Sequence, residues 1–409
     1  MIRVWTDNQP AGDLDRYELR GSTFTYDRAA DEAREVSLTM PLRTASWNIP
    51  IGVAPIFEMN LPEGALRERL RLAFAKATSS FYELDLLTIV GRSQLGRIRY
   101  TGTEEKLNED VPFQSVDEIL ANRRGGGLYR YLIERFASYS GISGVQPKFL
   151  IRDQNGFSNG GEMKDRLSST FRGATHIVKF WDAAEFPQLA ANEFFCLKAA
   201  EKCGLVVPPH RLADDGGALV IERFDLRADG TYRGFEDFCV LNARRTDEKY
   251  RGSYETQVMR RFEQFAKSES AIAESLQLFT LIALNCAIRN GDAHLKNFGV
   301  IYDSVRSEAH LAPVYDLVTT TVYLPKDEMA LKLNGTSQWP TGKDLIRFAE
   351  GKSLATKRDV VRIFDRISTA LSEATPGVEE YRSEHAEFKD VGRRMLEEWE
   401  SGRKSLEVK

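Results

Sequence analysis

The sequence is poor in the residues that build disulfide frameworks and structural metal sites. Its 409 residues include four cysteines and five histidines. The cysteines form no CxxC pair, and no histidines are paired at ligand spacing, which excludes a disulfide scaffold and argues against a structural zinc site. We therefore expect reduced cysteines in apolar surroundings, at Cys196, Cys203, Cys239 and Cys286.

Long apolar runs and a strong net charge are also missing. No run reaches membrane-spanning length, and residues 1–7 lack the apolar core of a signal peptide. The net charge is −4, so any affinity for nucleic acid must come from a local patch or from a partner. These features predict a cytoplasmic protein that makes no membrane contact.

The most informative stretch lies between residues 272 and 316. Residues 272–288 are apolar almost all round, which predicts a helix buried in a core. Asn290-Gly291 is a turn signal that ends it. A polar loop follows, and residues 298–302 and 310–314 then read as two short strands joined by a turn. The pattern predicts that this hairpin returns Asp316 to the loop that the helix delivers.

The loop carries the residue types that phosphoryl transfer requires. An acid accepts the proton of the attacking hydroxyl, an amide and a second acid hold magnesium, and a lysine offsets phosphate charge. Asp292 precedes Asn297 by five residues, the spacing that protein kinases use, and Lys296 lies beside them. We predict Asp292 and Lys296 as catalytic residues, and Asn297 with Asp316 as the metal ligands. The alternative is a polar turn in which Asp316 caps a helix.

Two earlier stretches fit the same chemistry. Residues 140–148 form a loop rich in glycine and serine before a strand, and backbone N–H groups of such loops can wrap phosphates. Residues 175–179 read as a central strand that ends in Lys179, and Glu193 opens the following helix. Kinases pair such a lysine with such a glutamate. Lys179 and Glu193 are therefore a predicted ion pair, although two unpaired surface charges would give the same pattern.

The run from Asn290 to Phe298, together with Pro313-Val314-Tyr315-Asp316, resembles the HipA family of bacterial serine/threonine kinases, the toxins of HipA–HipB toxin–antitoxin modules. Leu61-Pro62-Glu63-Gly64 is similar to an element of the HipA N-terminal subdomain, and residues 222–225 match the HipA hinge. The resemblance implies a kinase that uses ATP and Mg²⁺. It assigns ATP contacts to Ser143, Gly144, Val145, Gln146, Lys148, Lys179, Glu222, Phe224, Asp225 and His294. His294 could instead brace the loop.

This chain departs from the family pattern at two places. The family carries an autophosphorylated serine in the phosphate loop, and the matching position here is Gly141. Ser143 and Ser140 are the remaining candidates for that modification. The family also commonly has Gln where this chain has Val240, a change that by analogy lies near the active cleft.

The resemblance further implies an α+β, two-lobed, protein-kinase-like fold with an all-helical C-terminal lobe. Short β-type runs at residues 2–5, 21–26 and 36–40 predict a mainly β N-terminal subdomain over residues 1–110. The kinase N-lobe would span residues 125–225 after a connection at residues 123–127, and the C-lobe would span 226–409. We expect three further helical segments within residues 341–405.

The family implies a partner of the HipB kind, a small helix-turn-helix antitoxin, so that DNA would be contacted only through it. It implies a protein substrate among translation factors such as an aminoacyl-tRNA synthetase. Two other interpretations stay open: a small-molecule kinase of the aminoglycoside-phosphotransferase type, and an inactive kinase-fold co-repressor. Leu61-Pro62-Glu63-Gly64 favours the protein kinase over the first, and the intact catalytic residues favour it over the second.

Overall fold

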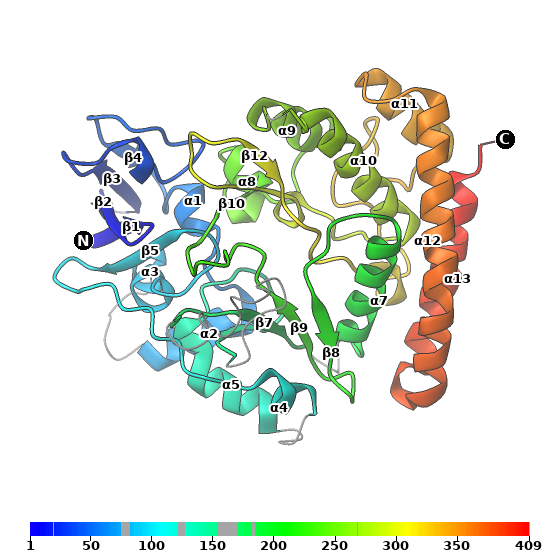
Figure 1. Cartoon of the computed structure of the whole chain (residues 1–409), viewed down its shortest axis with the longest axis horizontal. Helices are drawn as coiled ribbons and strands as arrows, with labels where there is room; N and C mark the ends of the chain where they lie inside the picture. The colour runs from blue at the N-terminus through cyan, green and yellow to red at the C-terminus, as the bar shows by residue number, and fades with distance from the viewer. Residues whose placement is uncertain are drawn as a thin grey trace.

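The computed structural model describes residues 1–18, 20–74, 82–121, 127–153, 171–181, 185–267 and 269–408. Most of residues 123–127, where we predict a connection between domains, fall outside these ranges. Figure 1 shows the N-terminal sheet at one end of the molecule and two long helices, α12 and α13, at the other. The catalytic residues predicted above lie on elements between these ends.

The N-terminal part is a five-stranded antiparallel sheet with three helices. Its strand order is β4-β3-β2-β1-β5. The predicted strands at residues 2–5 and 21–26 are confirmed, and their apolar side chains alternate with more exposed ones. The elements are β1 (Ile2–Thr6), β2 (Gln9–Tyr17), β3 (Gly21–Tyr26), β4 (Trp47–Ile49), α1 (Pro55–Glu58), α2 (Gly64–Phe74), α3 (Glu83–Val90) and β5 (Ile98–Gly102).

The predicted strand at residues 36–40 is wrong. The chain there makes a tight turn that closes with a single bridge between Ser37 and Met40. Ser37 Oγ and Leu38 N donate hydrogen bonds of 2.9 and 2.8 Å to the buried carboxylate of Glu236. Because the backbone N–H of Leu38 bonds to a side chain from a distant part of the chain, it is not available for a sheet ladder.

The middle of the chain forms a four-stranded antiparallel sheet in the order β6-β7-β9-β8. The predicted strand that ends in Lys179 is confirmed as β7, and the predicted helix carrying Glu193 is α7, which packs against β8 and β9. The elements are α4 (Val116–Leu120), α5 (Leu128–Phe136), β6 (Lys148–Ile151), β7 (His176–Lys179), α7 (Leu189–Lys202), β8 (His210–Leu212) and β9 (Leu219–Glu222).

The expectation of an all-helical C-terminal lobe is wrong, because residues 226–409 contain a third antiparallel sheet. Its order is β10-β11-β12. The predicted hairpin supplies β11 and β12, and β11 also pairs with β10, with Gly234 opposite Tyr302. The strands are β10 (Gly234–Asp237), β11 (Gly299–Tyr302) and β12 (Ala309–Leu311). β10 lies far from the hairpin in sequence, so this pairing had no local signal.

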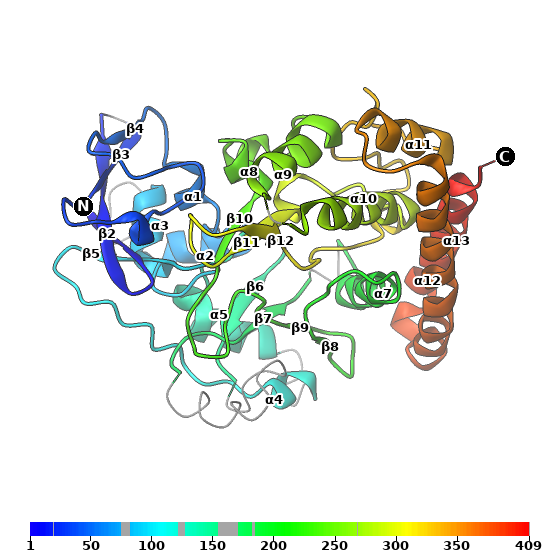
Figure 2. The same ribbon diagram turned by 45° about the horizontal axis from the view of Figure 1, so that its top comes forward.

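Helices make up the rest of this part. The predicted buried helix is confirmed as α10, and the three segments expected within residues 341–405 are α11, α12 and α13. α12 and α13 lie side by side and antiparallel, and α12 also packs against α7 (Figures 1 and 2). The helices are α8 (Phe238–Leu241), α9 (Arg260–Phe265), α10 (Ala271–Ala287), α11 (Gly342–Gly351), α12 (Lys357–Glu384) and α13 (Lys389–Leu406). None of the described helices is both long and apolar enough to cross a bilayer.

Short helical turns complete the chain. A π-helix, η6 (Tyr254–Met259), leads into α9. The 3-10 turns are η1 (Glu32–Arg34), η3 (Ala137–Tyr139), η5 (Thr246–Glu248), η7 (Leu295–Asn297), η8 (Thr320–Val322) and η9 (Ala386–Phe388). η7 lies in the predicted catalytic loop and ends at Asn297, whose side chain bonds to the backbone of Asp316.

Candidate active site

One pocket of about 1260 Å³ brings together residues from all parts of the chain. Its walls come from the loop at residues 142–148, from β7, β9 and β10, from the loop at residues 290–297, and from the segment around Asp316. The N-terminal sheet domain reaches it through the turn at residues 59–65. A pocket of this size can enclose most of a nucleotide-sized ligand.

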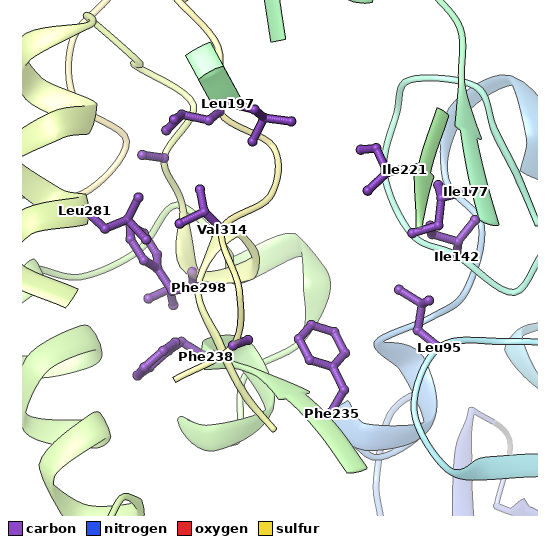
Figure 3. Close-up of a cluster of buried hydrophobic side chains, with 14 of the residues drawn as sticks. Leu95, Ile142, Ile177, Leu197, Ile221, Phe235, Phe238, Leu281, Phe298 and Val314 are labelled. Carbon is purple, nitrogen blue, oxygen red and sulfur yellow. The ribbon is translucent and has the colours of Figure 1, made fainter. Parts of the chain in front are cut away.

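One end of this pocket is apolar and aromatic. The ring of Phe224 stacks on Tyr315, with centroids 5.9 Å apart and planes 14° apart. Five more lining side chains are buried hydrophobic residues, drawn in Figure 3: Leu95, Ile142, Ile177, Ile221 and Phe235. Such a surface suits a flat, mainly apolar ring system that leaves its polar edge to backbone groups.

Two lysines and two carboxylates form the charged centre of the pocket. Lys148 and Lys179 stand directly opposite one another on β6 and β7. Lys179 Nζ donates to Glu193 Oε1 at 2.6 Å and also contacts Asp316 Oδ1, while Lys148 Nζ lies 3.4 Å from Asp316 Oδ2. The structure therefore brings together the predicted pair of Lys179 and Glu193, and it places Asp316 in contact with both lysines.

Asp316 and Lys179 hold each other in the ionised form. Burial would raise the pKa of Asp316, but Lys148 and Lys179 outweigh it and hold that pKa well below its ordinary value. Burial also disfavours the charge of Lys179, but Asp316 and Glu193 outweigh it and raise the pKa of that lysine. Among the described residues Lys148 forms an ion pair with Asp316 alone, so burial prevails there and lowers its pKa.

The predicted metal ligands lie next to each other. Asp316 has a left-handed backbone with φ of 52°, a conformation that aspartate tolerates better than most residues. Asn297 Nδ2 donates to the carbonyl oxygen of Asp316 at 3.4 Å. Asn297 Oδ1 is buried and makes no hydrogen bond to any described residue. An orphaned amide oxygen beside a carboxylate fits a hard cation such as Mg²⁺, which prefers oxygen ligands.

Asp292 lines the same pocket and is an exposed residue between two buried ones, Gly291 and Ala293. Its backbone N–H donates to Asn290 Oδ1 at 3.1 Å, and its Oδ1 accepts a hydrogen bond of 2.7 Å from the hydroxyl of Tyr250. The surrounding protein raises the pKa of Asp292 by desolvation, and the Tyr250 hydrogen bond lowers it in part. A carboxylate with a raised pKa in a cleft can accept a proton from a hydroxyl.

His294 and Lys296 flank this acid on the inner side of the loop. Burial lowers the pKa of His294 to about 3, so the imidazole is neutral at physiological pH. Its Nδ1 is buried without a hydrogen-bond partner among the described residues. Lys296 Nζ donates to the carbonyl oxygen of Met59 at 2.9 Å and lies 3.4 Å from Asp237 Oδ2. Lys296 thus ties the loop to the N-terminal part and to the start of α8.

The predicted phosphate loop borders the lysines. Gly144 has φ of 125°, and a Cβ there would lie 2.5 Å from Lys148 Nζ, so only glycine fits. Val145 is 65% exposed, and Gln146 Nε2 is buried with no partner among the described residues. Ser143 Oγ donates to Glu63 Oε1 at 2.5 Å. Gln146 Nε2 is therefore one loop donor without a partner among the described residues, while Ser143 is held by the N-terminal part.

Gly141, the position that matches the family's modified serine, has no room for a side chain. A Cβ there would lie 2.5 Å from Gln94 Cβ and 2.7 Å from the carbonyl oxygen of Ser93. The backbone N–H of Gly141 also donates to that carbonyl oxygen at 2.9 Å. The loop is thus packed against the N-terminal part at this point.

Three predicted residues do not line the pocket. Ser140 is fully buried, and its hydroxyl donates to the carbonyl oxygen of Phe136 and accepts from Leu150 N. Asp225 is also fully buried and pairs with Arg223 at 2.6 Å. Glu222 closes β9 next to the pocket residue Ile221, but its side chain is not part of the wall. Their side chains are therefore placed for structural contacts or solvent rather than for a ligand.

Many pocket residues were missed by the sequence analysis, and three of them contact one another or the predicted site residues. Glu63 comes from the N-terminal part, to which we had assigned no chemistry, and it pairs with Lys249 Nζ at 3.2 Å. Tyr250 follows Lys249 and contacts Asp292. The resemblance at Leu61-Pro62-Glu63-Gly64 was the one available signal for Glu63. Lys249 and Tyr250 lie in a polar stretch without any motif.

Comparisons with known protein families cover most of the chain. Residues 140–375 match the family model described as the HipA-like C-terminal domain. Residues 2–101 match the model described as the HipA N-terminal domain. The two matches therefore include both the pocket and the N-terminal sheet that reaches it.

Individual relatives agree with these matches. The chain is 28% identical over 329 residues to "Putative kinase Y4dM" of Sinorhizobium fredii, covering 76% of this chain and 73% of that protein. It is 26% identical over 352 residues to "Putative kinase Y4mE" of the same organism, covering 79% and 78%. In three dimensions it matches HipA of Shewanella oneidensis MR-1, solved with HipB and operator DNA, with a TM-score of 0.67 and 18% identity over the whole of both chains. At that identity the structural match shows the fold.

Proposed function

Because this chain belongs to the HipA family, we propose that it is an ATP- and Mg²⁺-dependent protein serine/threonine kinase with a two-lobed, kinase-like architecture. One observation carries the proposal: Lys179 joins Glu193 and Asp316 in the same pocket in which Asp292 is exposed and the side-chain oxygen of Asn297 has no partner among the described residues. Phosphoryl transfer needs this combination of positive charge, metal ligands and a proton acceptor.

Each group has a role that its surroundings support. Lys148 and Lys179 would hold the phosphates, and the apolar end at Phe224 and Tyr315 would hold the base. Asn297 and Asp316 would hold Mg²⁺, which offsets negative charge on the transferred phosphate when it is bound. Asp292 would orient the acceptor hydroxyl and take its proton.

The proposed substrate is a protein hydroxyl, on a translation-related protein such as an aminoacyl-tRNA synthetase, and Ser143 is the proposed site of autophosphorylation. The proposed partner is a HipB-like helix-turn-helix antitoxin, through which the chain would meet DNA. The Shewanella HipA was solved with such a partner and its operator, and that assembly supports the proposal for this chain by family membership.

The test is transfer of labelled γ-phosphate from ATP, with Asp292→Asn as the matched control. We expect label on this chain or on a protein from its own cell extract, with Mg²⁺ required and with Asp292→Asn inactive. Label in the low-mass fraction alone would favour a small-molecule kinase. Equal labelling by the wild type and Asp292→Asn, or none by either, would contradict the proposal and favour a co-repressor without catalysis.

A further inference from the structure

The hydroxyl of Tyr250 already makes the contact that an acceptor hydroxyl needs. It donates a hydrogen bond of 2.7 Å to Oδ1 of Asp292. The side chain of Tyr250 is 51% exposed, so the ring is not fixed by burial and can rotate toward solvent. If Asp292 is the proton acceptor, a substrate hydroxyl and the phenol of Tyr250 compete for the same carboxylate.

The backbone that carries Tyr250 is held in place from two sides. Leu295 N donates to the carbonyl oxygen of Lys249 at 3.1 Å, which ties the segment to the catalytic loop. Lys249 pairs with Glu63 from the N-terminal part at 3.2 Å. The Tyr250 ring meets the ring of His294 edge to face, with centroids 5.0 Å apart. The hydroxyl is therefore presented to Asp292 by a braced backbone and a half-exposed side chain.

We propose that Tyr250 is an acceptor-site gate, whose phenol occupies Asp292 until a substrate hydroxyl displaces it. The inference rests on the proposed function and deepens it, because it states how the same site is regulated. Its consequence is that bound ATP is protected from water. In the suppressed reaction, water gives a proton to Asp292 and its oxygen bonds to the γ-phosphorus. The bond from that phosphorus to the β–γ bridging oxygen breaks, and ADP and phosphate leave.

A purely positioning role for Tyr250 fits the structure less well. Asp292 is already anchored through its own backbone N–H to Asn290. Two more exposed apolar side chains line the pocket, Val145 at 65% and Leu324 at 53% exposure. They offer apolar surface to a protein segment that brings its hydroxyl to Asp292. A side chain needed only to orient the acid would be expected to be buried and fixed.

The test compares Mg²⁺-ATP hydrolysis, without added protein acceptor, in the wild type and Tyr250→Phe. The substitution keeps the ring and removes only the hydroxyl. A hydrogen bond to a charged group is worth roughly a 10- to 100-fold change in an equilibrium, so we expect hydrolysis to rise roughly 10-fold or more while ATP affinity stays within about twofold. Tyr82→Phe, an exposed tyrosine that does not line the pocket, is the matched control and should change nothing.

A second measurement separates a gate from a structural role. The Tyr250 hydrogen bond lowers the pKa of Asp292. In Tyr250→Phe, the fall in hydrolysis rate at acid pH should therefore begin at a higher pH than in the wild type. If Tyr250→Phe hydrolyses ATP at the same rate as the wild type or more slowly, and hydrolysis still requires Asp292, the gate is wrong but the proposed function stands. If Asp292→Asn hydrolyses ATP as the wild type does, the proposed function fails and the gate fails with it.

Discussion

Asp316→Asn is the most informative single substitution, because Asp316 touches both lysines and is a proposed metal ligand. Its carboxylate contacts both Lys148 and Lys179, and its backbone carbonyl accepts from Asn297 Nδ2. The substitution keeps the size of the side chain and removes one negative charge. We therefore expect two separable effects, one on nucleotide binding with Mg²⁺ and one on the stability of the empty protein.

The effect on stability follows from the charges that remain. At 3.4 Å, the attraction between Lys148 and Asp316 is about 5 kcal/mol at an effective dielectric constant of 20. Desolvation offsets most of it, and removing one partner of a buried pair typically costs about 3–5 kcal/mol. Glu193 still neutralises Lys179, so we expect a loss of about 3 kcal/mol or less.

The pH dependence of this contribution has a definite sign. Burial would raise the pKa of Asp316, but the two lysines hold it well below its ordinary value. The stabilisation is therefore complete above the unfolded-state pKa of about 4 and is lost as the pH falls through the lower folded-state value. Wild type and Asp316→Asn should thus differ in melting temperature by a constant amount between about pH 5 and pH 8.

The binding assay is calorimetric titration of ATP, with Mg²⁺ and with a chelator. The affinity of the wild type for ATP should rise when Mg²⁺ is present, and in Asp316→Asn this rise should be about 100-fold smaller. Even residues that only hydrogen-bond to a metal ligand change metal affinity by about 10–100-fold. Asp303→Asn, an exposed aspartate on the β11–β12 turn, is the matched control. Equal wild-type affinity with Mg²⁺ and with chelator, or an Asp316→Asn protein that still responds to Mg²⁺, would refute the assignment.

Three further predictions use the same assays. Asp292→Asn should bind ATP within a few-fold of wild type and lose phosphotransfer by roughly 100-fold or more, the contribution of a general base; near-normal transfer would place the active site elsewhere. Lys179→Ala should weaken ATP binding and destabilise the protein by about 3–5 kcal/mol, because buried Glu193 loses its 2.6 Å partner; an unchanged melting temperature would contradict this. Mass spectrometry after incubation with ATP should find phosphate on Ser143 and not on buried Ser140. Asp292→Asn should carry no phosphate. Phosphate found only outside residues 140–148 would exclude this loop as the site of autophosphorylation.

Local patterns explain the elements that could be predicted from the sequence. α10 is apolar on nearly all faces and ends at a strong turn signal, so its position and the loop after it followed from neighbouring residues. The same is true of β7, which is short, apolar and ends in Lys179. The spacing of Asp292 and Asn297 is local as well, so both could be proposed before the fold was known.

Contacts between distant residues explain what the sequence could not predict. Glu63 meets Ser143 across 80 residues, and Tyr250 meets Asp292 across 42. Neither contact has a periodic pattern, and a polar side chain on a loop is usually solvated. The prediction of Ser140 as a modification site fails because this serine is buried: its hydroxyl bonds to two backbone groups inside the core. Composition and spacing do not reveal which of two neighbouring serines points inward.

The shared position of Asp316 also changes how its role has to be understood. The sequence suggested one task for Asp316, metal binding, and a separate one for Lys179, phosphate binding. In the folded chain two lysines and two carboxylates balance each other. A nucleotide alone would draw the lysines away and leave Asp316 uncompensated, while a cation alone would add charge beside two ammonium groups. Together they exchange partners without leaving a buried charge unpaired. On the proposed function, this balance of charge predicts that ATP and Mg²⁺ enter as one complex.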